Sequence, residues 1–196
     1  MLYTFLAYLI LVIVRPHEFV EGLADYDLPR YLLLTTFLLW MFRMGKTLTA
    51  PQQLLIPVFC VFAALSRPLS GWVGGILPAL GDLIPLMMLF FACAALMEEQ
   101  RSAVRIIIVT CLCTLVLVAH GIDQVTHDGV GWTGETMFVD EGAPRIKYIG
   151  PFADPNDLAM LFVICFPMCI FLAMRAAILL RAFWLAAAGF LVYGIL

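Results

Sequence analysis

The sequence predicts an all-α fold, a polytopic transmembrane helical bundle of about six to seven spans with one long extracytoplasmic loop. Of its 196 residues, 64% are apolar and 13% are charged, whereas soluble domains have about 45–50% and about 25%. At a mean hydropathy of +1.03, one compact core could not enclose the apolar side chains, so most must face lipid or other helices. The apolar runs do not alternate with polar residues, which favours helices over a β-barrel. This composition excludes a soluble globular enzyme.

Charges and helix breakers divide the chain into seven apolar stretches, near residues 1–14, 28–44, 54–65, 76–97, 103–119, 158–174 and 182–196. No basic residue precedes the first stretch and no small-residue cleavage site follows it, so we expect a retained membrane helix rather than a removed signal. The stretch 54–65 would cover only about 18 Å of a hydrocarbon core of roughly 30 Å. It must therefore borrow flanking residues, thin the bilayer or lie at the interface.

Four residues that interrupt or cap helices open the fourth stretch: Pro78, Gly81, Asp82 and Pro85. We therefore expect its spanning part to begin near Leu83, after an interfacial loop at residues 71–81. Asp82 could line a cavity, but a helix N-cap in the headgroup region is the preferred interpretation. The fifth helix is expected to close at His120, as an interfacial polar residue.

The basic residues predict a cytoplasmic N-terminus. When successive connections alternate between the two sides and the long loop is discounted, six Lys and Arg residues fall on one side and three on the other. The richer side is the cytoplasmic one. This topology divides the chain into N-terminal helices at 1–119, an extracytoplasmic loop at 120–157, and C-terminal helices at 158–196, of which we expect the last to be cut short.

The polar residues exclude several kinds of site. The 11 Lys and Arg residues form no basic stripe, so nucleic acid is not expected as a partner. The six cysteines lie within apolar runs and lack zinc or disulfide spacing, which favours a packing role. His17, His120 and His127 lack metal-ligand spacing, so neither a metal nor another cofactor is expected. Because no nucleophile motif is present, we assign no catalytic residue.

The connection 120–157 is the most informative segment. It has 38 residues and holds 9 of the 25 charged residues, and connections of this length are commonly functional. Its last residues predict a helix start: Pro155 fixes the backbone, and the side chain of Asn156 or Asp157 can accept free amide protons. One interpretation is simply a capped helix that enters the membrane.

A second interpretation rests on two cations just before that helix start. Arg145 and Lys147 lie on an extended stretch, 145–149, in which polar and apolar residues alternate. Alternation would aim both cations the same way. Two cations beside a helix N-terminus predict a binding site for an anionic group such as a phosphate or diphosphate.

The same segment resembles a known family. Arg145 followed by Gly150-Pro-Phe-Ala-Asp-Pro-Asn-Asp-Leu-Ala159 is similar to the Arg…Gly-x-Phe-x-(Asn/Asp)-Pro-Asn-x-Leu-Ala signature of the O-antigen ligase/polymerase-like family. Val14-Arg-Pro-His-Glu-Phe-Val20, with Leu28-Pro-Arg30 before the second helix, resembles members associated with exosortase-type polysaccharide loci. The resemblance extends over the N-terminal half of such a protein.

The resemblance implies a membrane glycosyltransferase of the GT-C type, which acts on the periplasmic side of the bacterial inner membrane without a metal. It would transfer a glycan from an undecaprenyl-diphosphate carrier to a lipid or sugar hydroxyl. By that resemblance Arg145 would hold the diphosphate, and Asp154, Asn156 and Asp157 would shape the loop–helix junction beside it. Arginine suits this role, because it offers a permanent charge to the leaving group.

Family members are longer and carry a second periplasmic loop with Arg and His residues. We therefore expect a truncated or divergent relative that is not competent as these 196 residues alone. Its partners would be membrane lipids and a polyprenyl-diphosphate-linked glycan. The alternative is a non-catalytic accessory subunit packed against other membrane protein subunits, such as a pigment or electron-transfer complex. A transporter is disfavoured, because the spans contain almost no charged residues.

Overall fold

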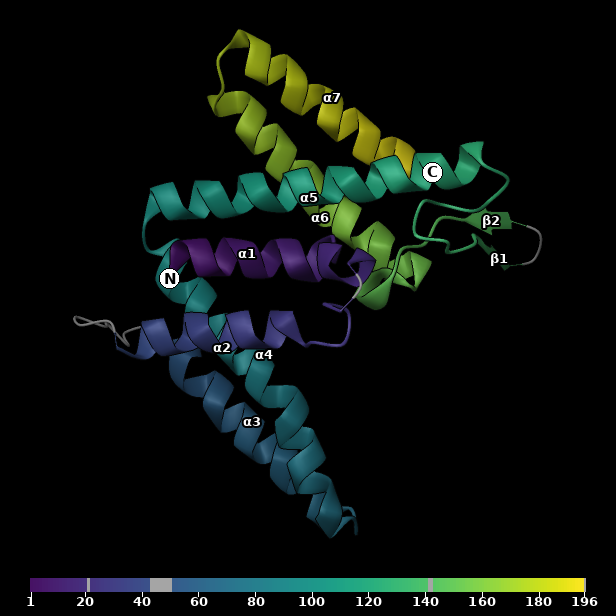
Figure 1. Cartoon of the computed structure of the whole chain (residues 1–196). Helices are drawn as coiled ribbons and strands as arrows, with labels where there is room; N and C mark the ends of the chain where they lie inside the picture. The colour runs from purple at the N-terminus through teal and green to yellow at the C-terminus, as the bar shows by residue number, and fades with distance from the viewer. Residues whose placement is uncertain (21, 43–50, 141–142, 196) are drawn as a thin grey trace. The chain divides into compact units, whose positions relative to one another are not determined.

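The computed structural model describes residues 1–20, 22–42, 51–140 and 143–195, which contain seven α-helices and one two-stranded hairpin (Figure 1). Five of these helices are long and apolar enough to cross a membrane: α3 (Pro51–Leu69), α4 (Ile76–Met97), α5 (Gln100–Thr126), α6 (Pro155–Arg175) and α7 (Ile178–Ile195). Two shorter apolar helices are α1 (Leu2–Ile13) and α2 (Leu28–Met41). The chain is therefore a multi-pass membrane protein built from helices, as the composition predicts.

Helix α3 is longer than the apolar run 54–65 from which it is predicted. It extends beyond 54–65 at both ends to reach 19 residues, a length of about 28 Å. The added residues include Gln52, Gln53, Ser66 and Arg67, which lie near the helix ends. Of the three alternatives for this stretch, the length of α3 supports the first, a candidate span that borrows flanking residues.

Helix α4 differs from the prediction. It is continuous from Ile76, so the expected loop extends only over residues 71–75 instead of 71–81, and the expected late start near Leu83 is wrong for the helix. Pro78 lies in the first turn, where its missing N–H has no partner in any case, and one further proline can be accommodated inside a membrane helix. Asp82 lies more than a turn inside α4 and does not cap it, because Gly75 occupies the N-cap position.

The chain divides into two compact units, and the first comprises residues 1–8 and 27–103. In this unit α2 and α3 both pack against α4. The Trp40 ring stacks on Phe91 with 4.8 Å between ring centroids. The buried Thr36 hydroxyl donates to the hydroxyl of Thr4 at 3.0 Å and thereby links α2 to the start of α1.

The second unit comprises residues 9–26 and 104–196. Helices α6 and α7 form an antiparallel hairpin, drawn from green to yellow in Figure 1. Leu117 of α5, Phe162 of α6 and Leu191 of α7 are fully buried in one hydrophobic cluster. Four cysteines lie in the same cluster, Cys111, Cys113, Cys165 and Cys169. Their burial agrees with a packing role.

The long connection of this unit is shorter than expected. Helix α5 does not close at His120 but continues to Thr126, because the residues after His120 keep the helical hydrogen bonds. The connection contains an antiparallel hairpin, β1 (Phe138–Asp140) and β2 (Ala143–Arg145), so strand pairing ends at Arg145. The backbone of Ile149, at the far end of the predicted extended stretch, is also extended. Helix α6 starts at Pro155 as predicted, but its cap is Asp154, which accepts from the Asn156 backbone N–H at 2.8 Å.

Candidate functional site

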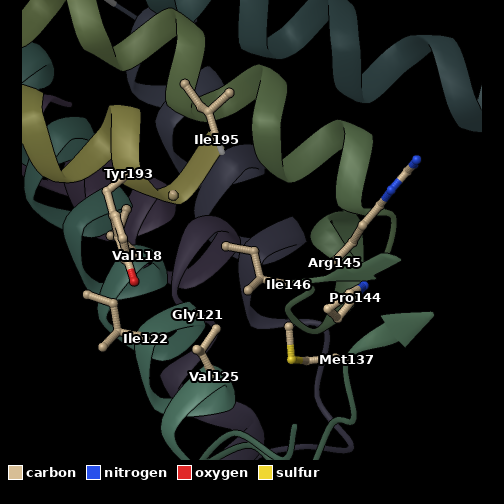
Figure 2. Close-up of a pocket in the computed structure, with 11 residues that line it drawn as sticks. Val118, Gly121, Ile122, Val125, Met137, Pro144, Arg145, Ile146, Tyr193 and Ile195 are labelled. Carbon is tan, nitrogen blue, oxygen red and sulfur yellow. The ribbon is translucent and has the colours of Figure 1, made fainter. Parts of the chain in front are cut away.

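A cavity of about 270 Å³ lies where the ends of α5 and α7 meet the loop of the second unit (Figure 2). Its lining comes from three elements, with Val118, Gly121, Ile122 and Val125 from α5, Met137, Pro144, Arg145 and Ile146 from the loop, and Tyr193, Gly194 and Ile195 from α7. Among the described residues that line it, Arg145 alone carries a charge. The cavity is therefore apolar on its helix side and cationic at its loop side.

Arg145 reaches this position because it is the last residue of β2. The register pairs it with Phe138 of β1, and the residue after it, Ile146, contacts α5. A Cβ atom added to Gly121 would lie 2.6 Å from the Ile146 side chain, so α5 has room for Ile146 only because residue 121 is a glycine. In Figure 2 Ile146 points into the cavity, whereas the Arg145 guanidinium extends outwards from its rim. The Arg145 side chain is exposed.

Lys147, the second predicted cation, lies beyond the end of β2. Its Nζ is 2.8 Å from the Glu135 carboxylate, and its backbone N–H donates to Gln124 Oε1 at 3.1 Å. The ion pair compensates much of the charge that we expect Lys147 to offer an anion. The role of Lys147 in anion binding remains a prediction.

A buried polar cluster fixes the loop on the end of α5. His120 Nε2 and Thr133 Oγ1 lie 2.8 Å apart, and Gln124 Nε2 donates to the backbone oxygen of Glu135 at 3.0 Å. The His120 ring also packs edge-on against Tyr148, with 4.9 Å between centroids. His120 is only 1% exposed and Gln124 is fully buried, so both are held in place by the loop residues that they bind.

The N-terminal stretch that follows α1 packs against the segment that precedes α6. The fully buried Tyr148 donates its hydroxyl proton to the Val14 carbonyl at 2.7 Å. Arg15 lies over Gly150 and forms an ion pair with Glu18. Sequence reasoning missed this contact, although both stretches carry the resemblance described above. The motifs mark both stretches, but a linear pattern cannot show that Arg15 and Gly150, 135 positions apart, are in contact.

Tyr148 gives the second unit a measurable dependence on alkaline pH. Burial, aided by the charge of Glu18, raises the pKa of Tyr148 from 10.0 to about 12. Above pH 10 the unfolded chain releases this proton but the folded chain retains it, so stability is lost as the pH rises towards 12. We expect up to roughly 1.4 kcal/mol of unfolding free energy to be lost per pH unit in that window.

Denaturant titrations in detergent, monitored by circular dichroism across alkaline pH, measure this slope. Tyr148→Phe removes the ionisable group, so its slope should be shallower, although the lost hydrogen bond lowers its stability at neutral pH by about 1 kcal/mol. An unchanged slope in Tyr148→Phe would contradict the assignment.

An apolar groove adjoins the cavity between α5 and α7. Its volume is also about 270 Å³, and it is lined by Leu115, Val118, Ala119 and Ile122 of α5 and by Phe183, Ala186, Ala187 and Phe190 of α7. Val118 and Ile122 line both spaces. The two hollows therefore adjoin: the groove has an apolar wall within two candidate membrane spans, and the cavity has Arg145 at its rim.

The other residues that the sequence analysis singled out do not line the cavity. Asp154, Asn156 and Asp157 are exposed at the first turn of α6, where Asp154 provides the cap. His17 is buried and its Nδ1 has no hydrogen-bond partner among the described residues, while His127 pairs with Asp123 just beyond α5. Within the part of the chain that the structure describes, no group of three or more His, Cys, Asp or Glu residues is placed to hold a metal ion.

The fold and site define the class of this protein. It is a multi-pass helical membrane protein with an arginine-rimmed cavity at the end of two candidate spans. Comparisons with models of protein families, with curated proteins and with solved structures gave no match.

Proposed function

We propose that this protein is an O-antigen-ligase-like protein of the bacterial inner membrane, truncated or divergent, which binds a polyprenyl-diphosphate-linked glycan at its periplasmic side. The observation that carries the proposal is that the α5/α7 groove adjoins the cavity at Arg145, since Val118 and Ile122 line both. A polyprenyl diphosphate has the matching chemistry, with a long hydrocarbon chain and a highly charged head. The sequence signature that begins at Arg145 supports the same ligand class.

Arg145 would bind the diphosphate through charge-assisted hydrogen bonds from its guanidinium. In glycan transfer, an acceptor hydroxyl attacks the anomeric carbon and releases its proton to water. The bond from that carbon to the diphosphate oxygen breaks, and its electron pair stays on the diphosphate. A permanent positive charge beside that oxygen stabilises the developing negative charge. The N-terminus would then be cytoplasmic, so that the loop between α5 and α6 is periplasmic.

The test is a binding comparison with the purified full chain in nanodiscs. Three probes separate head from tail: undecaprenyl diphosphate, the neutral undecaprenol and inorganic pyrophosphate. We expect undecaprenyl diphosphate to bind at least about tenfold more tightly than either of the others, since only it occupies both hollows. Equal binding of undecaprenol, or no binding of the diphosphate lipid, would overturn the proposal.

A variant that fills the groove sharpens this test. Ala186 is exposed and lines the groove, so Ala186→Trp should weaken undecaprenyl diphosphate binding without affecting pyrophosphate. Ala182→Trp is the matched control, because Ala182 is also exposed on α7 but does not line the groove. Equal effects of the two substitutions would remove the groove from the site.

A second candidate function is that of an accessory subunit in a larger membrane complex. Helix α3 favours it, since only 6% of its apolar window is buried within the described chain, and both lipid and a partner subunit would cover such a surface. Purification in mild detergent distinguishes the two functions. Stoichiometric co-purification of other membrane subunits, without carrier binding, would favour the accessory role.

A further inference from the structure

Two residues with left-handed backbone conformation meet beside the candidate site. Arg15 has φ 55° and ψ 44°, and Gly150 has φ 64°. A Cβ atom built on Gly150 would lie 2.6 Å from Arg15 Cζ and 2.7 Å from Arg15 Cδ, so the Arg15 side chain lies directly on the Gly150 backbone. Only glycine at position 150 permits both this conformation and this contact.

The neighbouring residues strengthen the contact. Tyr148 donates its hydroxyl proton to Val14, and its backbone N–H donates to the Phe152 carbonyl at 2.9 Å, which closes the turn around Gly150. We call residues 14–19 the N-terminal clamp, since they contact both Tyr148 and Gly150. The clamp therefore holds the backbone that begins three residues after Arg145.

The chemistry of Arg15 favours positioning over direct anion binding. Its guanidinium is engaged by Glu18, and its side chain is only 27% exposed, so its charge is already compensated. A left-handed arginine costs about 1 kcal/mol and persists where surrounding contacts impose it. The flat guanidinium and aliphatic stem cover the glycine backbone, a packing role for which arginine is suited.

We propose that Arg15 is a positioning residue of the carrier site: through Gly150 and Tyr148 it holds the segment that carries Arg145 at the cavity. The structural part of this inference stands on the contacts above. Its consequence for ligand affinity rests on the proposed function. The clamp thus gives a structural role to residues 14–19, which do not line the cavity.

The test uses the full chain in nanodiscs and two readouts, amide hydrogen exchange at Tyr148 and the Kd for undecaprenyl diphosphate. In Arg15→Ala we expect exchange at Tyr148 to rise about tenfold, because the turn opens locally, and affinity to fall about tenfold. Arg30→Ala is the matched control, since Arg30 is an exposed arginine of α2 outside the second unit. It should leave both readouts unchanged.

Gly150→Ala separates positioning from direct charge. This substitution displaces the Arg15 side chain but keeps both Arg15 and Arg145, so positioning predicts the same loss of affinity and a non-additive double variant. Wild-type affinity in Gly150→Ala alongside a loss in Arg15→Ala would make Arg15 a direct ligand and overturn the inference. Faster hydrogen exchange at Tyr148 with unchanged affinity in both Arg15→Ala and Gly150→Ala would show that the clamp is only a structural contact. That result would also overturn the inference that Arg15 positions the carrier site.

The exchange readout also distinguishes the two proposals. If the wild-type chain does not bind undecaprenyl diphosphate, the proposed function fails, but exchange at Tyr148 still decides whether the clamp holds the turn. Unchanged exchange in Arg15→Ala would overturn the clamp itself, whatever the ligand.

Discussion

Arg145→Ala is expected to weaken undecaprenyl diphosphate binding by about 10- to 100-fold and, in any form of the protein that transfers glycan, to reduce transfer to background. The physical reason is the loss of charge-assisted hydrogen bonds at the only charged position that lines the cavity among the described residues. The substitution should leave membrane insertion and the helical circular dichroism signal unchanged, since the side chain is exposed. Titration of each variant with the lipid in nanodiscs measures the effect.

Lys147→Ala is the matched comparison for Arg145→Ala. It lies two residues further along the same segment, but it does not line the cavity, and its ammonium is paired with Glu135. We expect a loss of affinity of about threefold or less, as for a screened charge. The sequence predicts that both cations contribute to binding. The ratio of the affinity losses in Arg145→Ala and Lys147→Ala therefore measures how much the ion pair with Glu135 reduces the contribution of Lys147. Wild-type binding and transfer by Arg145→Ala would exclude Arg145 from the site.

Gly131→Ala is expected to destabilise the folded loop by about 2 kcal/mol. A Cβ atom at residue 131 would lie 2.6 Å from His120 Cε1 and 2.8 Å from Gln124 Cγ. Neither neighbour can turn out to solvent, because both are buried and bonded to the loop. The loop must therefore shift away from α5, which breaks the contact between His120 and Thr133. Thermal unfolding in detergent, followed by tryptophan fluorescence, reports this change because Trp132 packs on His120.

Gly189→Ala controls for the general effect of adding a methyl group. A Cβ atom at Gly189 meets no atom of the described chain within 4 Å, and alanine favours a helix over glycine by roughly 0.5–1 kcal/mol. This variant should be as stable as the wild type or slightly more so. If Gly131→Ala unfolded like Gly189→Ala, the close packing of the loop on α5 would be contradicted.

The helical elements were largely predictable from local pattern, and the errors have local causes. Apolar runs predict α5, α6 and α7 because lipid leaves backbone groups no partners outside the helix. Prolines near the start of α4 predict a late helix start, but a proline in the first turn of a helix does not interrupt its hydrogen bonds. His120 predicts a helix end at the interface, but the loop folds over it and supplies its partner Thr133, and α5 continues to Thr126.

The candidate site was predictable only in part. Arg145 could be selected from its motif, and Asp154, Asn156 and Asp157 from turn chemistry, since both signals are local. The pairing of Lys147 with Glu135 and the contact of Arg15 with Gly150 depend on distant parts of the chain. No periodicity encodes them, because they arise where the ends of helices meet a folded loop.

The amino-acid sequence alone determined that this protein lies in a membrane as helices, since its apolar content and unbroken runs leave no other way to satisfy the backbone in lipid. The tertiary structure alone decided which residues line the cavity and the groove between α5 and α7, that Lys147 pairs with Glu135, and which N-terminal residues contact the loop. The physical reason is that hydropathy acts residue by residue, whereas charge compensation and close packing depend on which side chains meet in space.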